Sequence, residues 1–318
     1  MTTYILRRIV QSFVVVIFVT VMVFLVMRLL PGDPVLMLVT SGELQEFTQE
    51  QIDALREELG LTNPLYIQYV DWLRKAVSGD LGKSLLHRYD IAEEIKRRLP
   101  VSLHLGAFSF IIGITVGSLL GAISALRRGK WVDMLVTVAA NIGITAPPFW
   151  LGILLIYILG LYLGWLPIYG YTSPFVDFGK SMLQSIMPIF CMSLFPIAST
   201  ARLMRSSVIE VIQQDYIRTA WSKGLNEKII VIRHVLKNAL MPVVTMQGTV
   251  LRNIIGGSVV IETVFFVPGM GLLLTNSILA HDYTVVQGII LILALAVVFS
   301  NLVIDIIYGW LDPRIQYE

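Results

Sequence analysis

The sequence predicts an all-α polytopic membrane protein with six transmembrane helices. Apolar residues make up 56% of its 318 residues and charged residues only 14%, a balance that would leave a soluble protein with a large exposed apolar surface. The apolar residues gather into segments of about twenty or more, the length at which a helix crosses the hydrocarbon core of a bilayer. These segments lie at roughly 9–29, 101–126, 132–163, 182–203, 239–263 and 284–308.

The first segment is expected to be retained as a transmembrane helix. Arg7-Arg8 precede an apolar run at 9–27, which is longer than the apolar core of a typical signal peptide. Arg28 follows this run, and no small-residue cleavage site comes after it. We interpret residues 1–29 as a cytoplasmic N-terminal end and the first span.

Residues 30–94 are predicted to form a small helical subdomain outside the membrane. The stretch is polar and too long for its charge to govern translocation. Thr48 and Gln51 have the spacing of a capping box. Asn63 is expected to be the N-cap of a further helix and Pro64 its first residue. Either a solvated loop with local helices or a contact surface for a partner protein would have these features.

The end of this polar stretch carries two more local signals. Asp90, with Glu93 three residues later, predicts a helix N-terminus that runs into the second span. The segment GDLGKS at 79–84 has glycines too closely spaced for a phosphate-binding loop, so we assign it to a turn. The chain therefore offers no nucleotide-binding loop of its own.

The third apolar segment, 132–163, is long for one crossing and short for two. Pro147-Pro148 in its middle remove two backbone donors and predict a kink. The N-terminal end, the turn at 127–130 and the stretch at 209–237 are all basic, and basic residues gather on the cytoplasmic side of membrane proteins. A single third crossing places all three on that side, so both termini are expected to be cytoplasmic.

Three glycines in the second span, Gly113, Gly117 and Gly121, recur every four residues. This spacing puts them on one helix face, where another backbone can approach closely. The approaching helix belongs either to the same chain, which is the default for such a face, or to a second subunit.

The stretch at 209–237 is polar and basic between two apolar spans. Gly224 can adopt the left-handed conformation that ends a helix, so the first of two short helices is expected to end near Lys223. Asn226 suits the N-cap of the second helix and Glu227 its first turn. The sequence predicts a helix-turn-helix outside the bilayer, although an amphipathic loop without a special role would have the same periodicity.

Arg252 lies near the middle of the fifth span, where an unpaired charge costs several kcal/mol. It is therefore expected to face a cavity or a partner. One interpretation is an interhelical contact, for example with Asp305. The other is the wall of a translocation path that meets an anionic group of the cargo, with Asn253 and Asn141 beside it. Glu262, near the outer end of the same span, would line the exit of that path or lie at an interface.

The sequence argues against several function classes. The motifs HExxH, GxSxG and CxxC are absent, and the four histidines fall in different predicted segments. No catalytic residue and no metal site are therefore expected. A net charge of +2 gives no electrostatic basis for binding nucleic acid. The single cysteine, Cys191, excludes an intrachain disulfide.

An ordered series of short motifs covers nearly the whole chain. In the polar stretch, Arg218-Thr219-Ala220 are followed, after three residues, by Gly224-Leu225. The other motifs are Arg7-Arg8, Pro31-Gly32-Asp33-Pro34, Leu59-Gly60-Leu61, Pro64, Gln68-Tyr69, Trp72, Gly79-Asp80-Leu81-Gly82, Ala146-Pro147-Pro148-Phe149-Trp150, Trp165-Leu166-Pro167, Glu262-Thr263-Val264-Phe265, Pro268-Gly269-Met270-Gly271, Asp282-Tyr283, Val286-Gln287-Gly288, Tyr308 and Leu311-Asp312-Pro313-Arg314. Together they resemble the B-type membrane subunit of the dipeptide, oligopeptide and nickel class of ABC importers.

This resemblance implies a type I ABC importer permease fold with a small helical insertion after the first helix. The permease core would occupy 95–308, with a coupling loop at 205–238, and a cytoplasmic tail would follow at 309–318. The coupling loop would contact the ATPase, although Arg218-Thr219 stand where Glu-Ala is usual in the family. The residues carried over to this role are Asp215, Tyr216, Arg218, Thr219, Ala220, Lys223, Gly224 and Leu225.

The resemblance also implies partners and a location. They are a homologous second permease subunit, two ABC ATPase subunits and an extracytoplasmic solute-binding protein, in the cytoplasmic (inner) membrane of a bacterium or archaeon. The chain itself would not be an enzyme and would bind no cofactor, since ATP and Mg act in the partner subunits.

The implied function is ATP-driven import of di- and oligopeptides. Nickel chelates, glutathione and oligosaccharides are alternative cargoes within the same family. An ATP-independent secondary transporter or channel is the alternative from another class. It would explain the spans and Arg252 but not the basic helix-turn-helix.

Overall fold

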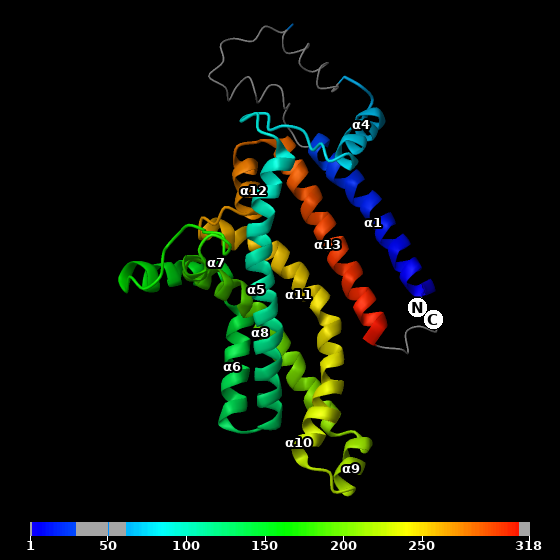
Figure 1. The fold of residues 1–318 in the computed structure, drawn as a ribbon, viewed down its shortest axis with the longest axis vertical. Helices are drawn as coiled ribbons and strands as arrows, with labels where there is room; N and C mark the ends of the chain where they lie inside the picture. The colour runs from blue at the N-terminus through cyan, green and yellow to red at the C-terminus, as the bar shows by residue number, and fades with distance from the viewer. Residues whose placement is uncertain (1, 30–49, 51–61, 312–318) are drawn as a thin grey trace.

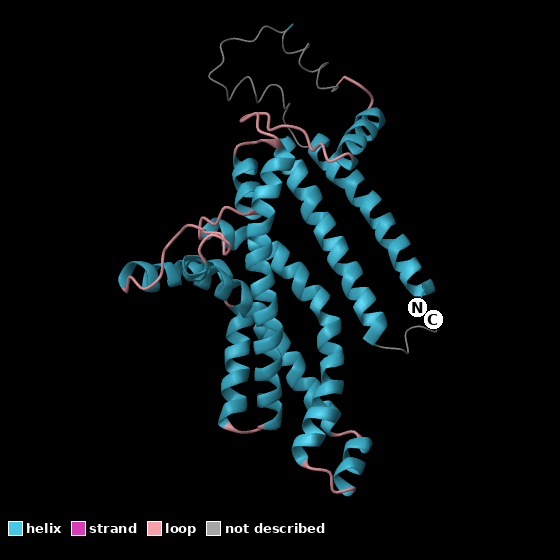
Figure 2. Ribbon diagram, in the orientation of Figure 1, coloured by secondary structure: helices cyan, strands magenta, loops and turns pink. Residues whose placement is uncertain are grey.

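The computed structural model describes residues 2–29, 50 and 62–311. This part of the chain is built of helices joined by turns and loops (Figure 1 and Figure 2). Its elements are α1 (Thr2–Leu29), α4 (Leu65–Val77), α5 (Ile91–Leu126), α6 (Trp131–Thr145), α7 (Pro148–Leu155), the π-helical η1 (Ile156–Tyr162), α8 (Phe178–Ile212), α9 (Asp215–Ser222), α10 (Glu227–Ile229), the π-helical η2 (Ile230–Leu236), α11 (Lys237–Val264), α12 (Met270–Leu279) and α13 (Tyr283–Leu311). The expected capping box at Thr48 and Gln51 and the motifs at 31–34, 59–61 and 312–314 lie outside the described residues.

Within the described ranges, five helices are long and apolar enough to cross a membrane: Tyr4–Leu29, Ile91–Leu126, Phe178–Ile212, Glu227–Val264 and Tyr283–Ile307. The remaining predicted span corresponds to α6 followed by α7 and η1. Taken together, these helices are also long and apolar enough to cross a membrane, but they are bent by 101° at their junction. The chain is therefore an all-α polytopic membrane protein, and its described part holds five candidate spans or, if the bent pair counts as one crossing, six.

The kink expected at the two prolines is confirmed, and it is a complete break in the helix with a bend of 101°. A residue that precedes a proline is disfavoured in the α region, and both Ala146 and Pro147 precede one. Both have extended backbone with ψ of 124°. Two successive extended residues end α6 at Thr145 and let α7 leave in a new direction from Pro148.

Local start signals are confirmed at α5 but not at α4. The Asp90 side chain accepts a hydrogen bond from the Glu93 amide at 3.1 Å, and α5 continues from there into the membrane span. At α4, Pro64 rather than Asn63 is the N-cap residue, and no side chain caps the helix. The helix therefore begins one residue later than predicted, at Leu65. Its Tyr69 hydroxyl hydrogen-bonds Thr20 of α1 at 2.9 Å, which fixes α4 to the end of the first span.

The segment at 79–84 is the predicted turn, with φ of +86° at Gly79 and +82° at Gly82. Ser84, which follows it, donates a hydrogen bond to Asp282 at 2.5 Å, and both residues are buried. This bond ties the loop before α5 to the connection between α12 and α13. Burial and the nearby Asp282 carboxylate raise the pKa of the Tyr89 phenol in the same loop.

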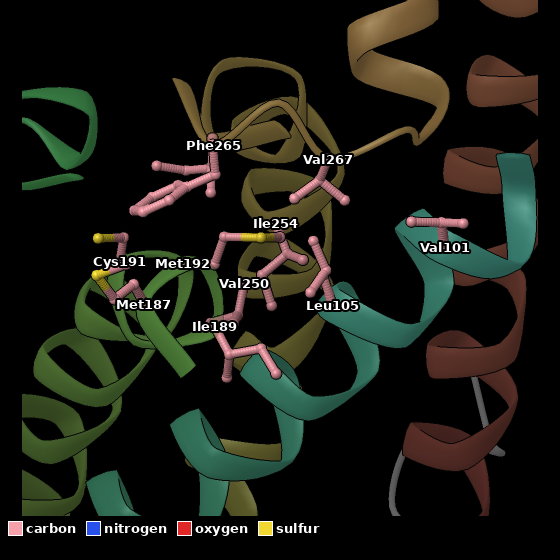
Figure 3. Packing of buried hydrophobic residues seen from close by; sticks show 11 residues of the cluster. Val101, Leu105, Met187, Ile189, Cys191, Met192, Val250, Ile254, Phe265 and Val267 are labelled. Atoms are coloured by element: carbon pink, nitrogen blue, oxygen red, sulfur yellow. The ribbon is translucent and has the colours of Figure 1, made fainter. Parts of the chain in front are cut away.

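The glycine face of α5 packs against α8 of the same chain. Added Cβ atoms at these glycines would meet Pro196, Ile197, Thr200, Ala201 and Met204. At Gly117, for example, the Cβ would lie 2.8 Å from the Ile197 carbonyl oxygen. Near the middle of the molecule, α5, α8 and α11 share an apolar cluster that includes Leu105, Met192 and Ile254 (Figure 3).

The long helices define two ends of the molecule. The α5–α6 turn and the segment from α9 to η2 lie at one end, which we call the hairpin end, whereas α4 and α12 lie toward the other, the α4 end (Figure 1). The first residues of α1 and the last turns of α13 lie side by side, since Arg8 pairs with Asp305 at 3.3 Å and the Tyr4 hydroxyl donates to the Asp305 carbonyl at 3.1 Å. In Figure 1 these two helix ends also point toward the hairpin end.

Candidate functional site

The predicted helix-turn-helix is present, and we call the segment Asp215–Leu236 the hairpin. Gly224 has φ of +75°, and its amide donates to the Trp221 carbonyl at 2.9 Å, as in a helix that ends with a left-handed glycine. The Asn226 side chain then accepts from the Lys228 amide at 2.9 Å and caps α10. The turn chemistry read from the sequence is confirmed.

The second helix of the hairpin was predicted to be short and separate, and this was wrong because it continues into the next membrane span. From α10 it passes through η2 into α11, so that Glu227–Val264 is one candidate span. No glycine or proline lies between Glu227 and Pro242 to stop it. One arm of the hairpin is therefore a direct continuation of a candidate membrane span.

The inner face of the hairpin is fixed to the helix bundle by apolar packing. Ile217, Ile230 and Val235 are completely buried, and Ala220 nearly so. They share one cluster with residues of α5 and α8, namely Ala122, Ala125, Met204 and Val208. We call this cluster the hairpin joint. A force on the hairpin therefore acts directly on the ends of α5 and α8.

The outer face of the hairpin is exposed and combines apolar with charged side chains. Trp221, Leu225 and Ile229 are each exposed by more than 40% of their surface. Polar residues such as Lys223 and Lys228 lie next to them in the sequence. Arg218 is also exposed and pairs only loosely, at 3.5 Å, with Asp215. An apolar patch rimmed by charged residues is typical of a protein-binding surface.

Of the residues predicted for the coupling loop, most lie on the outer face. Asp215, Tyr216, Arg218, Thr219, Lys223, Gly224 and Leu225 are exposed, whereas Ala220 is buried in the hairpin joint. Tyr216 accepts a hydrogen bond from Asn238 at 2.9 Å, which links α9 to the start of α11. The structure thus brings seven of the eight residues to one accessible surface.

Arg252 does not pair with Asp305, which was the example given for an interhelical contact. Its guanidinium donates to Asn301 of α13 at 3.1 Å and to Thr249 of its own helix at 2.9 Å. Asp305 instead pairs with Arg8 of α1. Asn301 and Asp305 lie one turn apart on the same helix, so α13 contacts α11 through one polar residue and α1 through the next.

The other residues suggested for a path do not gather around Arg252. Asn253 lines a pocket of about 380 Å³ between α6, α7, α8 and α11, together with residues such as Gly143, Pro148 and Met192. Successive helix residues differ in direction by about 100°, which explains why Arg252 meets α13 and Asn253 does not. Asn141 is exposed and does not line this pocket.

Glu262 is completely buried and lines no open surface of this chain. Its carboxylate accepts from the Gly271 amide at 2.6 Å and from the Leu272 amide at 3.4 Å. These amides belong to the first turn of α12, where a helix has unpaired donors and favours negative charge. Glu262 therefore holds α12 onto α11.

One charge cluster, centred on the buried carboxylate of Asp133, was not predicted. Asp133 of α6 receives two hydrogen bonds from the Arg205 guanidinium of α8, at 2.7 and 2.9 Å. Ser124 of α5 donates to the same carboxylate at 2.6 Å, and the Gly129 amide at 3.0 Å. The signal available in the sequence was a lone carboxylate at the start of one apolar segment and an arginine just after the end of another, but nothing local says that these two meet.

Among the described residues, no group of three or more His, Cys, Asp or Glu side chains is placed to hold a metal ion.

Comparisons with known proteins cover the whole chain. Residues 117–317 match the family of binding-protein-dependent transport system inner membrane components, and residues 1–106 match the N-terminal family of the same membrane components. A Brucella suis protein named as a peptide transport system permease is 41% identical, and the match covers 100% of both chains. The oligopeptide transport system permease protein AppB of Bacillus subtilis is 37% identical, again over 100% of both. A Sinorhizobium fredii protein named as a peptide ABC transporter permease is 37% identical over the same share.

These matches agree with the apolar spans and with the exposed hairpin at one end of the bundle. The chain belongs to the binding-protein-dependent transport system inner membrane components, and within them to the peptide-type ABC importer permeases.

Proposed function

We propose that this chain forms half of the translocation pathway of an ATP-driven importer of di- and oligopeptides. The observation that carries this proposal is the full-length similarity to relatives named for peptide and oligopeptide transport. The exposed hairpin supports it, because a permease driven by a separate ATPase needs a rigidly mounted surface for that subunit to bind.

The proposed assembly contains a homologous second permease subunit, two ABC ATPase subunits and an extracytoplasmic solute-binding protein. The outer face of the hairpin binds the ATPase, which holds ATP and Mg and carries out hydrolysis. The chain itself performs no catalysis. Closure of the ATPase pair displaces the hairpin and, through the hairpin joint, switches the bundle between inward-facing and outward-facing states.

The proposed topology has six crossings in the inner membrane and cytoplasmic termini. In this arrangement α6 with α7 and η1 is one bent crossing, the hairpin end is cytoplasmic, and the α4 end is outside. The basic residues support it, since the turn at 127–130 and the hairpin lie at the same end (Figure 1). The described part of the predicted subdomain, residues 62–94, then lies on the side from which a solute-binding protein delivers cargo.

The wall of the path is proposed to include Asn253, which lines the pocket of about 380 Å³, and Arg252 and Asn141, which are exposed on the isolated chain. A second permease subunit would close the path around them. Polar residues at membrane depth are found at such cavities because lipid offers them no hydrogen-bond partner.

Uptake by the reconstituted transporter tests this function. The chain is assembled in liposomes with its second permease, its ATPase subunits and its solute-binding protein, and uptake of labelled dialanine and penta-alanine is measured with and without ATP. ATP-dependent uptake of either peptide is expected. Uptake without ATP would instead support a secondary transporter or channel, and selective uptake of nickel–histidine, glutathione or maltotriose would overturn the assignment of peptide cargo.

A further inference from the structure

The Asp133 cluster lies beside the hairpin joint but is not part of it. On α5, Ser124 lies between Ala122 and Ala125, which are both residues of the joint. Arg205 follows Met204, another joint residue, on α8. The same two helices therefore carry an apolar contact with the hairpin and, next to it, a polar contact with α6.

Both carboxylate oxygens of Asp133 accept two hydrogen bonds each. Arg205 binds both oxygens of Asp133, and each oxygen has one further donor, Ser124 or the Gly129 amide. The Asp133 side chain is only 9% exposed, and the Arg205 side chain is 32% exposed. A bidentate arginine–carboxylate pair fixes both the distance and the angle between the two groups, which adds geometric specificity to the packing of the helices that it joins.

We propose that the Asp133–Arg205 pair is a positioning clamp that makes α6 move together with the hairpin-bearing end of α8. This inference rests on the proposed function, since it concerns how the hairpin drives transport. Neither residue touches cargo or ATP in this scheme, and both act through the helices that they join.

The consequence of the clamp lies at the other end of α6. That end leads to the break at Pro147-Pro148, and Gly143, Ile144 and Pro148 form one wall of the pocket that Asn253 lines. Displacement of α8 by the hairpin would, through the clamp, pull on this wall. If the clamp were broken, the ATPase would still hydrolyse ATP, but the pocket wall on α6 would not move with α8.

The first test measures transport and ATP hydrolysis separately in the assembled, reconstituted transporter, with dialanine as the probe. Asp133→Asn and Arg205→Met are each expected to lower uptake per ATP hydrolysed at least about fivefold, the scale of a typical coupling between sites. The hairpin is intact in both variants, so ATP hydrolysis is expected to continue. Arg128→Gln is the matched control, because it removes an exposed positive charge from the same α5–α6 turn and should leave the ratio unchanged.

A double variant separates positioning from stability. Replacing an ion pair whose carboxylate is buried by apolar residues of similar size often leaves stability unchanged or improves it. Asp133→Leu with Arg205→Met is therefore expected to accumulate in the membrane and unfold at the wild-type temperature. It is nevertheless expected to show low uptake per ATP. Normal uptake per ATP in this double variant would overturn the proposal even if the single variants fail to accumulate.

A distance measurement tests the clamp without cargo. Spin labels at Lys130→Cys and Gln213→Cys, in a Cys191→Ser background, report the separation between the start of α6 and the end of α8. In the wild-type assembly this distance is expected to be the same in the nucleotide-free and ATP-trapped states. In the double variant it should differ by about 2 Å or more, the scale of helix shifts between packed states. Equal distances in both states of the double variant would refute the clamp, whereas absence of peptide uptake by the wild type would refute only the proposed function.

Discussion

At the scale of single residues, Gly117 shows how little room separates α5 from α8. A Cβ there would lie 2.8 Å from the Ile197 carbonyl oxygen and 2.8 Å from the Thr200 Cβ. Gly117→Ala is therefore expected to lower the free energy of unfolding by about 1–3 kcal/mol, the usual cost of overpacking a close contact. Titration of the purified chain with SDS in detergent micelles measures this change.

The control for this prediction is another helical glycine. A Cβ at Gly256 of α11 would meet nothing within 4 Å, so Gly256→Ala should leave stability unchanged or raise it slightly, since alanine is the better helix former. Equal losses in the two variants would show that the α5–α8 contact is not the cause.

Glu262 gives a second prediction at this scale, because its carboxylate supplies the acceptor for two amides of α12. Glu262→Gln keeps an oxygen that can accept these bonds, whereas Glu262→Leu leaves both amides buried without a partner. The leucine variant is expected to be about 1–3 kcal/mol less stable than the glutamine variant. The thermal unfolding midpoints of the two purified variants compare them, and identical midpoints would argue against this role for Glu262.

At the scale of elements, the turn of the hairpin depends on backbone conformation rather than on space. Gly224 has φ of +75°, but a Cβ there would meet nothing within 4 Å. A bulky side chain therefore fits, and its cost comes from the left-handed backbone, about 1–2 kcal/mol for an ordinary L-residue. Gly224→Val should uncouple ATP hydrolysis from uptake while the chain still inserts into the membrane.

Gly224→Asn is the matched variant for this prediction, because asparagine tolerates the left-handed region. It should retain most of the ATP-driven uptake, measured in liposomes alongside the amount of inserted chain. Wild-type uptake by the valine variant would contradict the importance of the turn for coupling.

Local elements were predictable to different degrees, and the reason is the range of the interactions involved. The caps at Asp90 and Asn226 and the glycine turn at Gly224 depend on neighbours within a few residues, so the sequence alone identified them. The continuous passage from α10 into α11 was missed because two short helices were expected, although no glycine or proline between Glu227 and Pro242 ends the second one. The two prolines at 147 and 148 indicated a discontinuity but not a turn of 101°.

At the scale of the whole molecule, the proposed topology predicts which residues water-soluble reagents reach from each side. Cysteine is introduced at three positions by Val176→Cys, Ser78→Cys and Lys228→Cys. Val176 lies between η1 and α8, Ser78 at the end of α4, and Lys228 on the hairpin. The only native cysteine, Cys191, is buried and should give little background. A membrane-impermeant maleimide is expected to label the first two in intact spheroplasts, and the hairpin position only after the cells are opened.

This experiment also decides how the bent segment crosses the membrane. Labelling of Val176→Cys from outside agrees with one bent crossing by α6, α7 and η1. Labelling of this position only after lysis would mean that the segment does not cross, and labelling of Lys228→Cys in intact cells would place the hairpin outside and contradict its binding to an ATPase.

The sequence by itself determined the class of the molecule, the positions of its long apolar helices and the chemistry of the hairpin turn. These features follow from composition, from runs of apolar residues and from caps, all of which are properties of neighbouring residues. Only the tertiary structure decided that Asp133 meets Arg205, that Arg252 binds Asn301 and not Asp305, and that Glu262 is buried under α12. These pairs join residues on different helices, and their meeting is set by the packing of whole helices against one another, which no local pattern in the chain specifies.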